Sequence, residues 1–162
     1  MPRKPRDIFH LSERMMGMDD ATWARHANPF SVYSRFSILP LMTLAIWSRA
    51  WLGGWALVPV GLVLVWTWWN PRAFGPPRRT DSWAAYGVMG ERMFLARRQT
   101  PIPHHHRAWG LGLTVIAGLG ILPWAYGLRV FDPGITLFGL TLTIGAKAWF
   151  VDRMVWLYRD RA

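Results

Sequence analysis

The sequence predicts an all-α, polytopic membrane protein with four transmembrane helices, arranged as two hairpins, and amphipathic helices on the cytoplasmic surface. Hydrophobic residues make up 52% of the 162 residues. Two stretches, 50–69 and 108–128, contain no charged residue, and each is long enough to cross a hydrocarbon core about 30 Å thick. Basic residues cluster in alternate connecting segments, as the positive-inside rule requires.

The first half of the chain supplies two predicted spans, 29–49 and 52–69, in one membrane domain that covers residues 1–162. Asn28 is expected to cap the first span, with the following proline in its first turn. Arg35 then lies within snorkelling reach of the headgroups. The Gly53-Gly54 pair is expected to reverse the chain before the second span.

The second half supplies the predicted spans 108–128 and 133–158. The "DPGI" stretch starts the fourth span, with Asp132 as its cap and Pro133 in its first turn. Residues 1–28 and 70–107 are the predicted cytoplasmic segments, and the second of them carries an amphipathic surface helix over 81–98.

Charge placement decides the number of crossings. Six basic residues lie in 1–35, seven in 70–107 and three in 153–161, whereas the two opposite tips carry only Arg49 and Arg129. A two-span protein would place basic loops on both faces, so we expect four spans with both termini and the middle loop in the cytoplasm. No signal peptide is expected, because the first 14 residues hold six charged side chains and no apolar run follows.

The net charge of +10 is interpreted as cytoplasmic loops beside an anionic leaflet, so the predicted partner is the lipid bilayer. No nucleic acid is expected as a partner, since no recognition motif accompanies the charge. The absence of cysteine excludes disulfides, thiolate metal ligands and a cysteine nucleophile.

Five short motifs resemble those of a family of small, uncharacterised bacterial and archaeal membrane proteins with four helices. They are "HANPFS" (26–31), "WNPRAF" (69–74), "GERMFLARR" (90–98), "IPHHHR" (102–107) and "DRMVWLY" (152–158). The resemblance covers roughly residues 20–160, and "HANPFS" differs from the family's "HANPWS" form by one aromatic residue. It implies a four-helix membrane protein and brings no established activity. We expect a location in the bacterial or archaeal inner (cytoplasmic) membrane.

The histidines support two interpretations. His26, Glu91, His105 and His106 would offer a mixed N/O ligand set to a divalent transition metal, a predicted cofactor in this interpretation. Adjacent helical side chains diverge by about 100°, so at most two of the three consecutive histidines would bind one ion. No His-x-x-x-His or His-Glu-x-x-His spacing occurs. In the preferred interpretation the histidines lie at the membrane boundary and contact headgroups or backbone groups.

Charges inside a predicted span are costly and often functional. Lys147 in the fourth span either snorkels towards the cytoplasm or faces inwards and pairs with Glu91 or Asp152. The predicted polar pocket consists of Asn28, Arg92, Lys147 and Asp152. The predicted headgroup contacts are Arg78, Arg79, Arg97, Arg98 and Arg107.

No Ser-His-Asp set, phosphate-binding glycine loop or paired-carboxylate motif is present, so no reaction class is indicated. The sequence therefore predicts a non-catalytic membrane module, either an accessory subunit of a larger membrane complex or a lipid-headgroup binder. Two alternatives remain open. One is a membrane-embedded metal-binding protein or metalloenzyme, and the other is a small transporter that works as a homo-oligomer.

Overall fold

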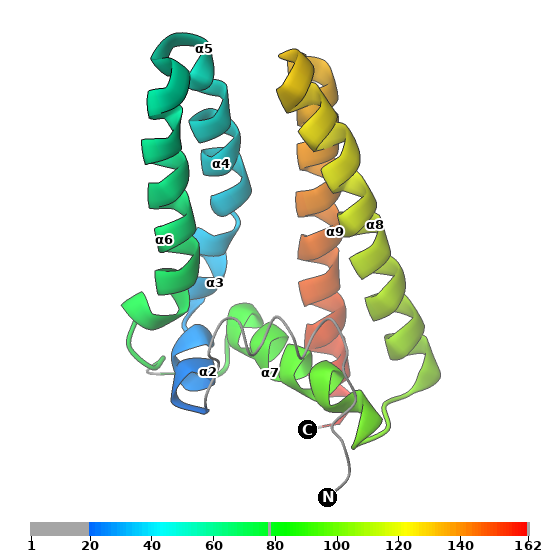
Figure 1. Ribbon diagram of the computed structural model, residues 1–162. Helices are drawn as coiled ribbons and strands as arrows, with labels where there is room; N and C mark the ends of the chain where they lie inside the picture. Colours follow the sequence, from blue (N-terminus) through cyan, green and yellow to red (C-terminus); the bar gives the residue numbers. More distant parts are fainter. Residues whose placement is uncertain (1–19, 78, 162) are drawn as a thin grey trace, which may run out of the picture.

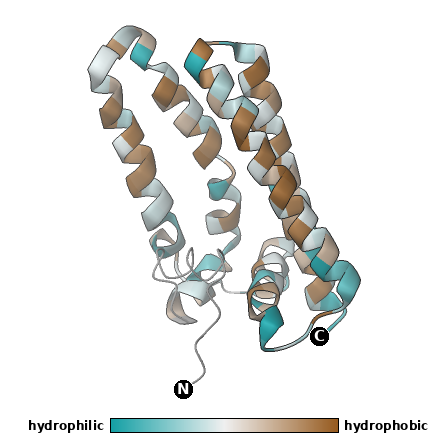
Figure 2. Cartoon of the chain, turned by 45° about the vertical axis from the view of Figure 1, so that its right-hand side comes forward, coloured by the Kyte–Doolittle hydropathy of each residue, from teal (hydrophilic) through white to brown (hydrophobic). Residues whose placement is uncertain are grey.

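The computed structural model of the protein describes residues 20–77 and 79–161, and every regular element within those ranges is a helix (Figure 1). Three helical stretches are long and apolar enough to cross a membrane: Pro29–Ala73, His104–Val130 and Pro133–Arg159. Apolar residues follow these long helices, whereas hydrophilic residues gather towards one end of the molecule (Figure 2). The all-α fold and membrane association predicted from the sequence are thus supported.

The first long stretch is bent back on itself. After α2 (Asp20–His26), the helices α3 (Pro29–Arg35) and α4 (Ile38–Trp47) follow one another, and α6 (Leu57–Ala73) returns beside them (Figure 1). The turn consists of α5 (Arg49–Leu52) and a 3-10 turn, η1 (Gly53–Ala56). Gly53 has a φ of +54°, which favours glycine. We refer to α3, α4 and α6 as the first helix pair.

The second helix pair is α8 (His104–Val130) and α9 (Pro133–Arg159), which pack along their length. Asp132 Oδ1 accepts a hydrogen bond from the Ile135 amide at 2.8 Å, and Pro133 lies in the first turn, as the sequence predicts. The two backbones approach closely: a Cβ on Gly139 would lie 2.2 Å from the Trp124 nitrogen. Small residues thus set the distance between these helices.

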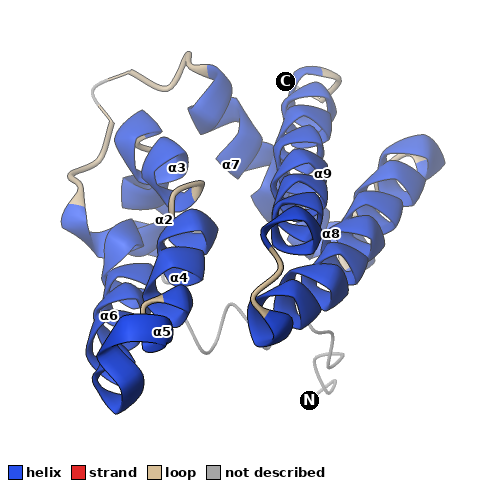
Figure 3. Cartoon of the chain, turned by 90° about the horizontal axis from the view of Figure 1, so that it is seen from above, coloured by secondary structure: helices blue, strands red, loops and turns tan. Residues whose placement is uncertain are grey.

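Helix α7 (Trp83–Leu95), extended by η2 (Ala96–Arg98), lies across the end opposite α5 (Figure 1). Seen along the long helices it lies between α3 and α9, and it contacts both pairs (Figure 3). On one side a Cβ on Gly90 would lie 1.9 Å from the Met154 carbonyl oxygen of α9. On the other side Ala85 and Val88 join a buried cluster with Trp23 and Val32. The expected surface helix 81–98 therefore packs mainly against protein.

The boundaries of all four predicted spans differ from those of the observed helices. The stretch 29–49 is interrupted at residues 36–37, between α3 and α4. The stretch 52–69 becomes Leu57–Ala73, because the 3-10 turn occupies Gly53–Ala56. The third helix begins at His104, so the three histidines form its first turn. The fourth ends one residue later than predicted, at Arg159.

Candidate functional site

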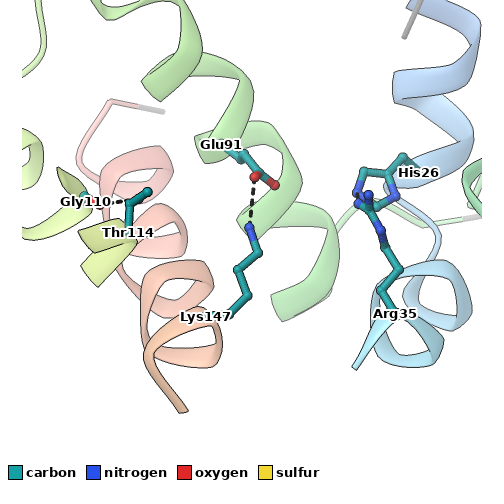
Figure 4. A network of polar contacts seen from close by, with 6 residues as sticks. All are labelled: His26, Arg35, Glu91, Gly110, Thr114 and Lys147. Atoms are coloured by element: carbon teal, nitrogen blue, oxygen red, sulfur yellow. Dashed lines mark hydrogen bonds and ion pairs between the residues drawn. The ribbon is translucent and has the colours of Figure 1, made fainter. Parts of the chain in front are cut away.

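A cavity of about 320 Å³ lies between the two helix pairs, beside α7. Four of its lining side chains are ionisable, and each comes from a different helix: His26, Arg35, Glu91 and Lys147 (Figure 4). The other lining residues are mainly apolar: Val32, Phe36, Ile38, Leu39, Gly87, Val88, Ile121, Thr143 and Val151. The cavity therefore combines a charged part with an apolar part.

Arg35 and His26 form the first half of the charged part. Arginine only donates hydrogen bonds, so its contact with His26 Nε2 requires an unprotonated Nε2. The proton of the neutral ring then lies on Nδ1, which is 3.2 Å from Ser31 Oγ. The Ser31 hydroxyl donates in turn to Asn70 Oδ1, also at 3.2 Å. This one assignment of donors and acceptors satisfies every hydrogen bond from Arg35 through His26 and Ser31 to Asn70.

Asn70 connects this chain to α6. Its side-chain nitrogen donates to Ser34 Oγ at 2.7 Å, and the residue is fully buried. Asn28 caps α3 by accepting from the Phe30 amide at 3.0 Å and donates to the Gly75 carbonyl at 2.9 Å. The motifs "HANPFS" and "WNPRAF" therefore meet in space and hold the first helix pair together.

His26 is neutral at ordinary pH. Burial lowers the pKa of its imidazole to about 3, with further lowering by Arg35 and Lys147 that outweighs the raising effect of Glu91. Only 3% of the residue is exposed. The imidazole therefore serves as a hydrogen-bond acceptor for Arg35 and adds no charge to the cavity.

Glu91 and Lys147 form the second half of the charged part, with 3.1 Å between Oε1 and Nζ. The sequence alternative in which Lys147 pairs with Glu91 is thus confirmed. Burial raises the pKa of Glu91, but the charges of Lys147 and Arg35 together bring it below its usual value. The carboxylate is therefore ionised. The same pair borders a second cavity of about 100 Å³ next to Leu113 and Phe150.

Arg35 has no carboxylate within 4 Å among residues 20–77 and 79–161; the ion pairs found there are His106 with Asp160 and Lys147 with Glu91. The nearby acid Glu91 is already bonded to Lys147. With His26 neutral, two cations and one carboxylate line the cavity. The lining carries a net positive charge that no described residue compensates.

Two further histidines, His105 and His106, form a separate cluster with Asp160. His106 Nε2 lies 2.7 Å from Asp160 Oδ2, and the His105 and His106 ring centroids are 4.1 Å apart. One potential ligand atom from each of these three residues lies within 4.8 Å of the others. The structure thus divides the predicted metal set, because His26 and Glu91 line the cavity instead. Asp160 is absent from the predicted set because it lies 54 residues away, at the end of α9.

The predicted polar pocket is also divided. Lys147 lines the cavity, whereas Asp152 accepts from Trp83 Nε1 at 3.2 Å, Asn28 caps α3 and Arg92 is exposed. Arg35 is the cavity residue that the sequence prediction places at the headgroups instead. The sequence signal for this polar side of α3 is the spacing of Ser31 and Ser34. Residues three apart share one helix face, and here that face is turned towards Asn70.

The predicted headgroup arginines take different positions. Arg97 donates to the Phe94 carbonyl at 2.9 Å and lies over the Phe94 ring. Arg78 lies outside the described residues. The exposed members are Arg79, Arg98 and Arg107.

Together these features define a class: small, all-helical proteins with membrane-type helices and a cationic cavity between two helix pairs. The chain belongs to a family of unknown function, DUF6653, which it matches over residues 10–162. No curated protein and no solved structure matches the chain. The family has no assigned activity, and the cavity is the feature from which a function can be argued.

Proposed function

We propose that this is a four-crossing membrane protein that binds the anionic group of a membrane amphiphile in the cavity between its helix pairs. It acts as a non-catalytic module. The observation that carries the proposal is the Arg35 guanidinium, which lines a mainly apolar cavity and has a neutral imidazole as its partner.

Four crossings are supported by helix length and by the positions of charges. A straight helix over the 45 residues of Pro29–Ala73 would be about 68 Å long, more than twice the thickness of a hydrocarbon core. The turn at α5 and η1 divides it into two antiparallel parts (Figure 1). Trp51 and Trp55 at this turn are 73% and 76% exposed, as expected of indole rings at a membrane boundary.

The crossings are tested with single cysteines, because the chain has none of its own. Gly54→Cys at the α5 turn should react with a membrane-impermeant maleimide on intact cells. Gln99→Cys, after η2, should react only in permeabilised cells. Labelling of both positions from the same side would overturn the four-crossing arrangement.

Ligand binding is supported by the cost of an uncompensated charge. A cation removed from water without a partner is unfavourable, and a bound anion relieves that cost. The planar guanidinium matches the two oxygens of a carboxylate or a phosphate. The apolar side chains of Phe36, Leu39 and Ile121 line the same cavity and suit a hydrocarbon chain. An amphiphile therefore satisfies both parts of the cavity.

Binding is tested with protein purified in a neutral detergent. Laurate should bind, dodecanol should bind at least about tenfold more weakly, and Arg35→Gln should lose at least about tenfold in laurate affinity, the scale of a charge-assisted hydrogen bond. Arg129→Gln, at the far end of α8, is the matched control and should bind as the unaltered protein does. Equal binding of laurate and dodecanol would contradict the proposal.

Metal binding is a second candidate function, favoured by the spacing of His105, His106 and Asp160. Two imidazoles and a carboxylate suit a zinc-type ion. After dialysis against zinc, elemental analysis should find about one equivalent in the unaltered protein and in His26→Ala, and none in His106→Ala. Failure of the unaltered protein to retain zinc would exclude this function.

A further inference from the structure

We propose that Glu91 determines the charge of the ligand, so that the cavity selects an anion with one negative charge over one with two. This inference rests on the proposed anion binding. It assigns a specificity role to Glu91 beyond its ion pair with Lys147.

The charge inventory of the cavity is the first argument. Arg35 and Lys147 each contribute one positive charge, Glu91 contributes one negative charge, and His26 is neutral. The net charge of the lining is +1, which one negative charge neutralises. A second negative charge would be left without compensation in an environment of low dielectric constant, where such an imbalance is costly.

The fixed position of the carboxylate is the second argument. Glu91 follows Gly90, whose backbone lies directly on the Met154 carbonyl of α9. One turn earlier, a Cβ on Gly87 would lie 2.6 Å from Val151 Cγ1. Because α7 is seated this closely on α9, its Glu91 side chain stays beside Lys147 (Figure 4). A dianion that approaches Lys147 therefore meets the Glu91 carboxylate.

The third argument comes from the two cavities. Glu91 and Lys147 line both the cavity of about 320 Å³ and the second cavity of about 100 Å³. The second cavity is lined otherwise by Leu113, Thr114, Ala117 and Phe150, and none of these is a cation. Displacing the carboxylate into the second cavity would therefore move it away from Arg35, which lines only the first, while Lys147 borders both. Glu91 remains part of the charge that the ligand encounters.

The test uses two probes that differ by one charge. Monododecyl phosphate carries close to two negative charges at pH 8.5, because the second pKa of a phosphate monoester is about 6. Dodecyl methyl phosphate carries one. The unaltered protein should bind the methyl ester at least about tenfold more tightly. Glu91→Gln keeps the size of the side chain, raises the lining to +2 and should reverse this preference, whereas Glu91→Asp should retain it.

A second measurement needs no variant. Between pH 8.5 and 5.5 monododecyl phosphate gains a proton, so its affinity for the unaltered protein should rise about tenfold. Affinity for the methyl ester should stay constant, because neither the ester nor His26, with its pKa of about 3, changes charge over this range. Equal affinities at both pH values for both probes would overturn the inference.

The outcomes separate the inference from the proposed function. If both phosphates bind equally well and both depend on Arg35, the cavity binds anions but Glu91 does not select their charge. If neither phosphate nor laurate binds to protein that melts cooperatively, the proposed function itself fails. At pH 5.5, where inorganic phosphate carries close to one negative charge, binding of phosphatidylglycerol in vesicles, laurate and inorganic phosphate then identifies the source of the anion as a lipid, a fatty acid or a soluble ion.

Discussion

The two helix pairs are held together by different interactions. In the second pair the backbones of α8 and α9 meet through Gly120, Gly127 and Gly139. In the first pair α3 and α6 are joined by the hydrogen bonds of Asn70 with Ser31 and Ser34. Lipid supplies little hydrophobic drive between helices, so small residues and polar side chains are the two available means. The glycine-packed pair forms a tight wall that contributes Lys147 to the cavity, and the polar pair contributes Arg35 from the other side.

The largest effect is expected from a substitution in the glycine-packed pair. A side chain on Gly139 would meet the Trp124 backbone nitrogen at 2.2 Å and the Gly120 carbonyl oxygen at 2.7 Å. Gly139→Leu should therefore destabilise the protein by at least about 3 kcal/mol, since backbone cannot yield as a side chain can. Thermal melting in detergent measures the loss. Gly145→Leu is the control, because a Cβ at Gly145 would meet nothing within 4 Å. It should melt close to the unaltered protein, and equal melting of both variants would contradict the close packing.

The second largest loss of stability is expected from a substitution in the first helix pair, which polar side chains hold together. Asn70→Ala removes the acceptor of the Ser31 hydroxyl and the donor to Ser34 Oγ, which should cost about 2 to 3 kcal/mol. Thr67, one turn earlier on α6, donates only to its own helix, to the Val63 carbonyl at 2.8 Å. Thr67→Ala should change stability by less than about 0.5 kcal/mol. If the two alanine variants unfold at the same denaturant concentration, the polar network does not hold the pair.

Acidification should weaken the first pair through His26. Its pKa is about 3 in the folded protein and about 6.5 when unfolded, so the unfolded state binds more protons between these values. Stability should therefore fall as the pH decreases below about 6.5, by about 2 kcal/mol at pH 5. His26→Gln cannot titrate and should remove this pH dependence when melting is followed from pH 7.5 to 5. An unchanged dependence would show that other groups cause it.

The smallest effect concerns the contact between the pairs near the α5 end. Trp124 Nε1 donates to Thr43 Oγ1 at 2.8 Å, so Trp124→Phe should cost about 1 kcal/mol in thermal stability. Trp55→Phe is the control, because Trp55 is 76% exposed. If both variants lose the same stability, this hydrogen bond does not join the pairs.

Local signals explain which parts of the fold were predictable. Asp132 and Pro133 act within one turn, and the start of α9 agrees with the sequence prediction. The packing of α7 on α9 depends on Gly87 and Gly90, which carry no apolar side chain and so weaken the amphipathic pattern. The fit of these glycines to Val151 and Met154 emerges only once both helices are placed.

The candidate site was predictable to a similar extent. Lys147 attracts notice because a charge inside an apolar span needs a partner, and the sequence supplies Glu91 as one of two choices. The importance of Arg35 depends on the absence of a nearby carboxylate, which is a property of the folded protein. Asp160 contacts His106 because the start of α8 lies beside the end of α9. The two residues are 54 positions apart, so no short sequence motif could predict this contact.

The hydrogen-bond chain that begins at Arg35 and His26 ends on an amide, Asn70. A side-chain amide neither accepts nor releases a proton at ordinary pH, so this chain is no conduit for protons between the two sides of a bilayer. Instead it keeps the charge of the cavity lining constant. The chain of hydrogen bonds fixes the His26 imidazole in one tautomer and leaves the charge of the Arg35 guanidinium unchanged while the surrounding pH varies. The electrostatic state of the cavity is then altered by its occupant rather than by the acidity of the cell.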